Sequence, residues 1–253
     1  MSTVGPTIVL APGAWHTADC FDALRDALHA KDWLTEAVEY PSVGAEPPTK
    51  GLADDASAVR SVLERLADEG KKIVLVGHSY GGLVIANAVK GLGYKQRQND
   101  GKVGGVIIMV YLAAFVTPLN GSIIQMLGGN FLPWMRADGE YVYADTPEKI
   151  FYHDVQPETQ KKVLSALKHQ SRRVFTDVVT YEPWHDIDCL YFFCDDDQAL
   201  PLPIQQGLAL SLGPNAPSFH VKASHSPFLS KPQEVAEGLE YAAKVGLDKI
   251  SGQ

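Results

Sequence analysis

The fold is decided by residues 73–85, which read IVLVGHSYGGLVI. This stretch holds the pattern G-x-S-x-G directly after an apolar run typical of a buried strand and directly before an apolar run typical of a helix. In that setting the pattern predicts a sharp strand-to-helix turn that lifts the Ser79 hydroxyl above a sheet. We expect strained backbone dihedrals at Ser79. Positions 77 and 81 require glycine, because a Cβ at either position would collide with the neighbouring strand or helix. The alternative is a glycine-rich turn that carries an inert serine.

Working outward from this turn, apolar runs of strand length alternate with stretches of helical periodicity. The expected strands cover residues 7–10, 36–40, 72–76, 106–112, 189–193 and 218–222. Helical spacing begins at Phe21, and further helices are expected over residues 59–70, 83–89 and about 233–245. This order predicts an α/β fold, in which a mostly parallel central sheet of about six strands is flanked on both faces by crossover helices.

Residues 117–185 interrupt the alternation with several helix-like stretches and many aromatic side chains. A structureless loop of this length is implausible inside a compact domain. We therefore predict a helical cap subdomain over residues 117–185, inserted after the fourth strand, and a core made of residues 1–116 and 186–253. The alternative is that this segment extends the main core.

Composition and charge limit the classes of function. The chain has 253 residues, of which 45% are hydrophobic and 21% charged, as in an ordinary globular protein. Its 22 Lys and Arg against 30 Asp and Glu give a formal charge of −8. An acidic surface repels phosphate backbones and anionic lipid, so we expect neither nucleic acid nor a membrane as partner.

The three cysteines, Cys20, Cys189 and Cys194, are odd in number and lack metal-ligand spacing. In a chain of this length they are typical of buried thiols in a reducing compartment. We see no basic region followed by an apolar run at the N-terminus, and no apolar stretch of membrane-spanning length. A cytoplasmic location is therefore expected.

A serine hydroxyl is a weak nucleophile at neutral pH and needs a histidine base, which in turn needs an orienting acid. A strand-to-helix turn that carries a nucleophilic serine, as predicted for residues 77–81, is called a nucleophile elbow. In proteins with such an elbow the three residues come in the chain order Ser, acid, His. Of the eight histidines, only His225 lies in a loop between the last expected strand and the last expected helix. His225 is thus the candidate base, and a surface histidine without a role is the alternative.

The candidate acid lies in the loop after the strand at residues 189–193, where Asp195, Asp196 and Asp197 follow one another. Parallel sheets place their ligands at such carboxyl ends. We favour Asp197, and Asp196 stays open because spacing alone does not separate neighbouring acids.

Ester cleavage also requires N–H donors for the oxyanion of the tetrahedral intermediate. The Tyr80 N–H, directly after Ser79, is one candidate. The second is expected from the loop after the first strand, most plausibly from the Ala14 N–H, beside Gly13. This chemistry needs no metal and no organic cofactor.

Together these residues resemble the α/β-hydrolase superfamily. Nearly the whole chain is similar to its small-esterase branch, which holds pyrethroid-hydrolase-like carboxylesterases, plant methyl-ester esterases and hydroxynitrile lyases. The segments that carry the resemblance are residues 9–16, 77–82, 151–154, 194–201 and 224–226. The resemblance implies a nucleophile at Ser79, an acid at Asp197, a base at His225 and an oxyanion hole at the N–H groups of Ala14 and Tyr80. It also implies that a homodimer is an option.

Several positions depart from the patterns of this branch. Pro12 stands where a histidine is common, and Ser226 stands where the lyases carry a lysine. His78 and Tyr80 stand where the lyases carry Glu and Cys around the serine. Without that lysine nothing obvious stabilises a leaving cyanide, so the departures disfavour a lyase.

The sequence therefore predicts a carboxylesterase-like serine hydrolase that cleaves an ester or a lactone of a small, largely apolar substrate through an acyl-enzyme. Trp15, His16 and Trp134 are expected to line its substrate pocket. Two alternatives are a lyase or carbon–carbon-cleaving enzyme on the same scaffold, and a non-catalytic receptor for small molecules.

Overall fold

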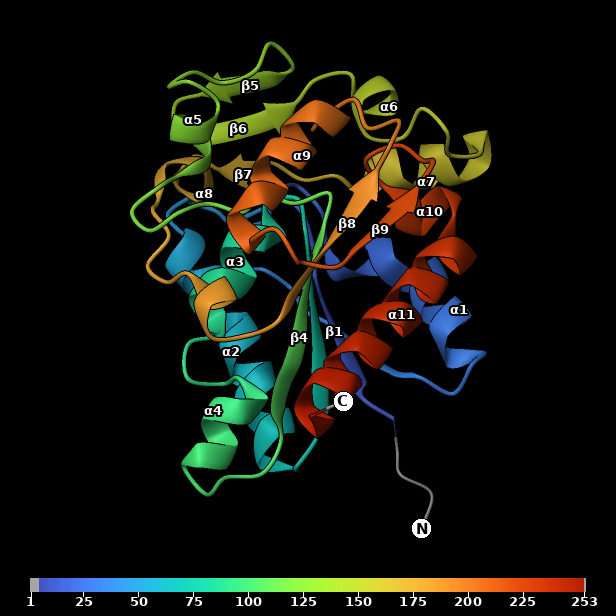
Figure 1. The fold of residues 1–253 in the computed structure, drawn as a ribbon. Helices are drawn as coiled ribbons and strands as arrows, with labels where there is room; N and C mark the ends of the chain where they lie inside the picture. The colour runs from blue at the N-terminus through green and yellow to red at the C-terminus, as the bar shows by residue number, and fades with distance from the viewer. Residues whose placement is uncertain (1–4, 253) are drawn as a thin grey trace.

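A computed structural model describes residues 5–252, and its centre is a sheet of six parallel strands in the order β2-β1-β3-β4-β8-β9 (Figure 1). The strands are β1 (Thr7–Ala11), β2 (Leu34–Ala37), β3 (Lys72–His78), β4 (Gly105–Leu112), β8 (Cys189–Cys194) and β9 (Ser218–Val221). The predicted α/β fold with about six mostly parallel strands is confirmed.

Helices cover both faces of the sheet because successive strand residues point to opposite sides. Ile8 and Leu10 of β1 pack in one apolar cluster with α1 (Asp22–His29) and α11 (Pro232–Ser251). The other face carries Val9 and packs against α2 (Leu52–Asp68) and α3 (Gly81–Ala88). Figure 1 shows these two helix pairs on either side of the sheet.

The bounds differ most from expectation at three elements. Helix α2 begins at Leu52 instead of residue 59. The second strand lies at Leu34–Ala37 instead of 36–40, because its pairing with β1 begins at Thr7↔Leu34 and ends at Leu10↔Ala37. The last helix continues to Ser251, beyond the expected end near residue 245. The core also contains short helices that periodicity did not predict, namely η1 (Ala18–Phe21), α4 (Tyr94–Asn99), α9 (Leu202–Ala209), η3 (Leu210–Leu212) and α10 (Pro227–Ser230).

The segment between β4 and β8 lies over the carboxyl end of the sheet (Figure 1). Its elements are α5 (Ile123–Met126), β5 (Met135–Asp138), β6 (Tyr141–Ala144), α6 (Pro147–Ile150), α7 (Pro157–Ala166), β7 (Gln170–Ser171), α8 (Arg173–Thr176) and η2 (Pro183–His185). The cap is therefore not purely helical, since β5, β6 and β7 form an antiparallel sheet. A two-residue turn, Gly139-Glu140, joins the first two strands, with Gly139 at φ 57°. The division into core and cap subdomains stays a prediction.

Three further observations concern the described residues 5–252. None of their helices is both long and apolar enough to cross a bilayer. They contain no cluster of three or more His, Cys, Asp or Glu side chains that could hold a metal ion. Cys20, Cys189 and Cys194 are buried free thiols.

Candidate active site

Ser79 lies in the turn between β3 and α3 and adopts a left-handed backbone conformation, with φ 54°. The end of β4 holds this strained turn, because Ser79 N donates to Leu112 O at 3.2 Å and Phe115 N donates to Ser79 O at 3.2 Å. A Cβ at Gly77 would lie 2.6 Å from Gly81 O, and a Cβ at Gly81 would lie 2.6 Å from Ala11 O. The turn thus has the strained serine and the tightly packed glycines that the sequence pattern led us to expect.

His225 lies in the loop between β9 and α10, and its Nδ1 is 2.7 Å from Asp197 Oδ2. Both side chains are buried, at 4% and 0% exposure. Because an ionised carboxylate only accepts, Nδ1 carries the proton and donates it to Asp197. The other carboxylate oxygen, Asp197 Oδ1, accepts the N–H groups of Ala199 at 2.7 Å and Leu200 at 2.9 Å.

The neighbouring acids have other roles. Asp195 contacts His220 through Oδ1 at 2.8 Å, and Asp196 is exposed. Of the three consecutive aspartates, Asp197 is the one whose carboxylate contacts His225.

One cavity brings together most of the residues that the sequence singled out. Its lining includes Ser79, His225, Ala14, Tyr80 and the three expected pocket residues Trp15, His16 and Trp134. Asp197 does not line the cavity and lies behind His225. Within residues 5–252, no hydrogen bond joins Ser79 Oγ to His225 Nε2. Bonds of this kind often tighten only when substrate is bound.

The backbone N–H groups of Ala14 and Tyr80 are placed beside this cavity. Both residues are buried, yet in the described part of the chain neither N–H donates to another protein group. Buried N–H groups are nearly always paired in folded proteins. Among residues 5–252 the N–H groups of Ala14 and Tyr80 are unpaired and lie at the wall of a cavity that also contains Ser79. They are therefore suited to donate hydrogen bonds to an oxyanion.

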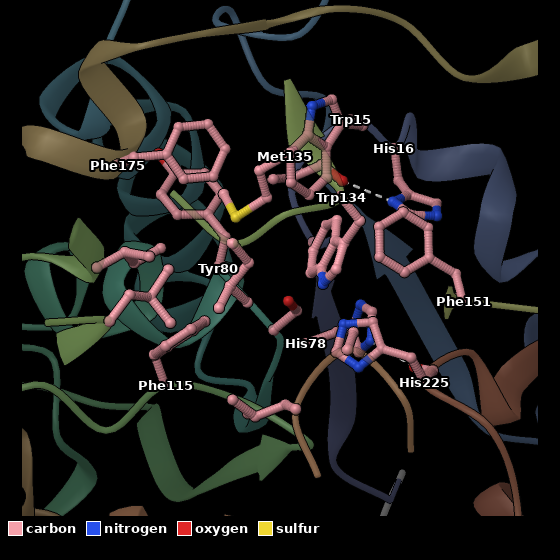
Figure 2. A pocket seen from close by; sticks show the side chains of 18 residues that line it. Trp15, His16, His78, Tyr80, Phe115, Trp134, Met135, Phe151, Phe175 and His225 are labelled. Atoms are coloured by element: carbon pink, nitrogen blue, oxygen red, sulfur yellow. Dashed lines mark hydrogen bonds between the residues drawn. The ribbon is translucent and has the colours of Figure 1, made fainter. Parts of the chain in front are cut away.

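The rest of the cavity wall is apolar and largely aromatic. Figure 2 shows Trp15, Trp134 and Phe151 toward His16, with Phe115 and Phe175 on the opposite side. The rings contact one another, with the Trp134 and Phe151 centroids 5.3 Å apart. Only about 30 Å³ of the cavity is open to water-sized molecules, room for roughly two waters.

Two further histidines near the cavity are uncharged at neutral pH. His16 donates from Nδ1 to Ala14 O at 2.7 Å and accepts at Nε2 from Tyr152 Oη at 2.6 Å, and burial lowers its pKa to about 4. Burial also holds the pKa of His78 well below its usual range, and His78 Nε2 donates to His225 O at 2.8 Å. These rings therefore fix backbone positions on both sides of Ser79.

The segment 151–154, which in the sequence carried only a resemblance to the small-esterase branch, holds the loop that carries His225. Asp154 Oδ2 accepts Ser224 N and Ser230 Oγ, each at 2.9 Å. Ser224 Oγ in turn donates to Phe151 O at 2.9 Å. These residues could be singled out from the sequence, but their contacts could not.

Gln205 on α9 carried no such signal, because a single glutamine in a helix is usually exposed. Its buried amide accepts Cys194 N at 3.0 Å and donates to Cys194 O at 2.9 Å and Leu200 O at 2.7 Å. It therefore fixes the loop that presents Asp197.

Comparisons with known proteins agree with this architecture. Residues 8–238 match the model of a family described as "Alpha/beta hydrolase family". The chain is 28% identical to "Alpha/beta hydrolase nvfD" of Aspergillus novofumigatus, over 94% of this chain and 96% of that protein. It is 25% identical to "Pyrethroid hydrolase" of Sphingobium wenxiniae, over 97% and 94%. A crystal structure of a pyrethroid hydrolase from Sphingobium faniae superposes with a TM-score of 0.73 at 21% identity, over 94% of this chain and 97% of that one.

Proposed function

This chain belongs to the alpha/beta hydrolase family, and from that premise we propose that it is a serine esterase acting on a carboxylic ester or lactone of a small, largely apolar substrate. Ser79 is the proposed nucleophile, His225 the general base and Asp197 the acid that orients it. The N–H groups of Ala14 and Tyr80 are the proposed oxyanion hole.

In this mechanism His225 Nε2 accepts the Ser79 hydroxyl proton while Oγ attacks the ester carbonyl. Asp197 holds the proton on Nδ1 and stabilises the imidazolium that forms. The negative charge on the carbonyl oxygen is received by the two N–H donors, each typically worth about 3 kcal/mol of barrier. His225 then protonates the leaving alcohol, and the same residue activates the water that cleaves the acyl-enzyme.

The observation that carries this proposal is the placement of His225. Its Nδ1 donates to the buried Asp197, while its ring and Ser79 line the same apolar cavity. A nucleophile, a base and an orienting acid in this relation are the requirement for activating a serine hydroxyl.

The test is Ser79→Ala, assayed with p-nitrophenyl acetate and p-nitrophenyl butyrate. We expect kcat to fall by at least about a thousandfold, because the nucleophile is lost while binding remains. Ser61→Ala, at an exposed position on α2, is the matched control and should keep full activity. Turnover retained in folded Ser79→Ala would refute the serine mechanism.

Two other functions of this scaffold are weaker candidates. The hydroxynitrile lyases that the chain resembles carry a lysine directly after the base, whereas this chain has the buried Ser226 there. Offering cyanohydrins and β-diketones alongside esters tests this activity. A non-catalytic receptor would not be labelled covalently at Ser79 by a fluorophosphonate, whereas we expect stoichiometric labelling.

The free thiols support the cytoplasmic location that we propose for this enzyme. We propose a small-molecule ester as its partner, without nucleic acid or membrane, and a homodimer as an option that light scattering tests.

A further inference from the structure

A chain of buried polar side chains connects the two sides of the proposed oxyanion hole. It starts at Tyr80, whose Oη donates to Asp55 Oδ2 at 2.6 Å. Asp55 also accepts Ser42 Oγ at 2.5 Å and Ser42 N at 3.0 Å. Ser42 Oγ accepts Gln170 Nε2 at 2.6 Å, and Gln170 Oε1 accepts Trp15 N at 2.8 Å. The chain thus ends at the residue directly after Ala14.

The chain runs from the turn after β3 to the loop after β1 through three other parts of the fold. Asp55 is on α2, Ser42 lies between β2 and α2, and Gln170 is in the cap strand β7. Asp55, Ser42 and Gln170 are each 0% exposed, so water does not compete for these bonds. The direction of each bond is fixed, since the backbone N–H of Trp15 only donates and the amide group facing it has to be the carbonyl.

One end of the chain lies at strained backbone, at Trp15, and the other end, Tyr80, directly follows the strained residue Ser79. Trp15 has φ 68° and Ser79 has φ 54°, values that bulky or non-glycine residues rarely adopt. Such conformations persist only where surrounding contacts hold them. Trp15 is held by the bond from Gln170, by Lys168 N donating to Trp15 O at 3.2 Å, and by its own Nε1 donating to Val142 O at 2.9 Å.

We propose that Asp55, Ser42 and Gln170 are positioning residues that hold the Ala14 and Tyr80 N–H groups at the separation required by the oxyanion. They contact neither substrate nor the reacting atoms and act through the backbone of the loop after β1 and of the elbow. This role presupposes the ester hydrolysis proposed above, and it adds residues from α2 and the cap to that reaction.

The charge state of Asp55 suits this role. Burial raises the pKa of Asp55 to about 6, so the carboxyl is ionised at neutral pH and accepts from both hydroxyls. The titratable groups around it are Tyr80, Tyr40 and Asp54. Within residues 5–252 no cation pairs with it, so hydroxyl and amide donors alone stabilise its charge.

The test removes single links and measures catalysis per active site. Tyr80→Phe removes one end of the chain and keeps the Tyr80 N–H, and Gln170→Met removes the other end. Tyr40→Phe is the matched control, because the Tyr40 hydroxyl is buried, lies beside Tyr80 and finds no hydrogen-bond partner among residues 5–252. Active sites are counted by end-point titration with a fluorophosphonate, and kcat and KM are then measured with p-nitrophenyl butyrate.

We expect kcat per titrated site to fall about tenfold or more in Tyr80→Phe and in Gln170→Met, with KM within about twofold, because loosened donors weaken transition-state stabilisation alone. Tyr40→Phe should stay within about twofold of the parent. In the double variant Tyr80→Phe/Gln170→Met, the fold-decrease in kcat should be smaller than the product of the two single fold-decreases, because both substitutions break the same chain of hydrogen bonds. If Gln170→Met does not fold, Ser42→Ala, which removes the central hydroxyl, takes its place.

An unchanged kcat per site in both variants, or a change confined to KM, would overturn the positioning role. If Ser79→Ala abolishes turnover while these variants keep the parent kcat, only the positioning role fails. If Ser79→Ala retains turnover, the proposed esterase function itself fails.

Discussion

At the scale of single residues, the site depends on ionisable side chains that are kept uncharged. His16 joins Ala14 to Tyr152 as a neutral ring, with one nitrogen donating and the other accepting. Protonation would put a second donor against the Tyr152 hydroxyl in a buried place. The low pKa of His16, caused first by burial, is therefore a requirement of the geometry around the candidate oxyanion hole.

This lowered pKa predicts how stability depends on pH. The pKa of His16 is about 4 when folded and about 6.5 when unfolded, so between these values the unfolded chain binds more protons. The free energy of unfolding should therefore decrease as pH falls from 6.5 to 4, by up to about 3 kcal/mol from this residue. Urea denaturation of the parent and of His16→Gln at both pH values measures the difference.

Asp55 contributes with the opposite sign, because its pKa is raised and the folded chain binds more protons between pH 4 and 6. It is present in both proteins, so the comparison isolates His16. Equal pH dependence in the parent and in His16→Gln would contradict the prediction.

At the scale of elements, the loop between β9 and α10 is not held by the sheet alone. Asp154, in the cap segment between α6 and α7, accepts one hydrogen bond from this loop and one from α10. The centroids of the Phe151 and His225 rings lie 5.7 Å apart. The cap thus contacts the loop that carries the candidate base, in addition to lining the cavity.

Asp154→Ala should therefore reduce activity through His225. We expect kcat to fall about tenfold and the free energy of unfolding by about 2–4 kcal/mol, since two hydrogen bonds to a carboxylate are lost. Asp154→Asn keeps an oxygen acceptor and should recover part of the kcat and part of the free energy of unfolding. Asp145→Ala, at a more exposed cap aspartate that pairs with Arg136, is the control for charge. Parent-like kcat in Asp154→Ala would show that the sheet alone holds the loop.

At the scale of the whole molecule, the cavity lies between the cap and the carboxyl ends of the strands. Parallel strands end at one edge of the sheet, so the residues after β1, β3, β8 and β9 meet there although they are far apart in the chain. Side chains of the cap, such as Leu132, Trp134 and Met135, form the facing wall of this cavity.

Because the cavity is narrow, replacing an aromatic side chain of its wall by a smaller one should change the preference for the length of the ester's acyl chain. For Trp134→Leu we expect the ratio of kcat/KM for p-nitrophenyl octanoate to that for the acetate to rise about tenfold, since extra methylenes then find room. Phe131→Leu is the control, because Phe131 packs on Phe175 without lining the cavity. An unchanged ratio in Trp134→Leu would place the acyl chain elsewhere.

The sheet, the elbow and the chain order of the candidate residues follow from the amino-acid sequence alone. These depend on short-range rules, namely apolar periodicity and the close approach that requires glycine at Gly77 and Gly81. The folded arrangement was needed to distinguish Asp197, which contacts His225, from Asp196, because adjacent side chains point to different sides and the Asp197 carboxylate is the buried one. The folded arrangement also decided that the cap contains a sheet, and that Gln170 bonds to Trp15 across 155 positions of the chain. Contacts between residues so far apart depend on how the cap packs over the core, and no local pattern of residues encodes that packing.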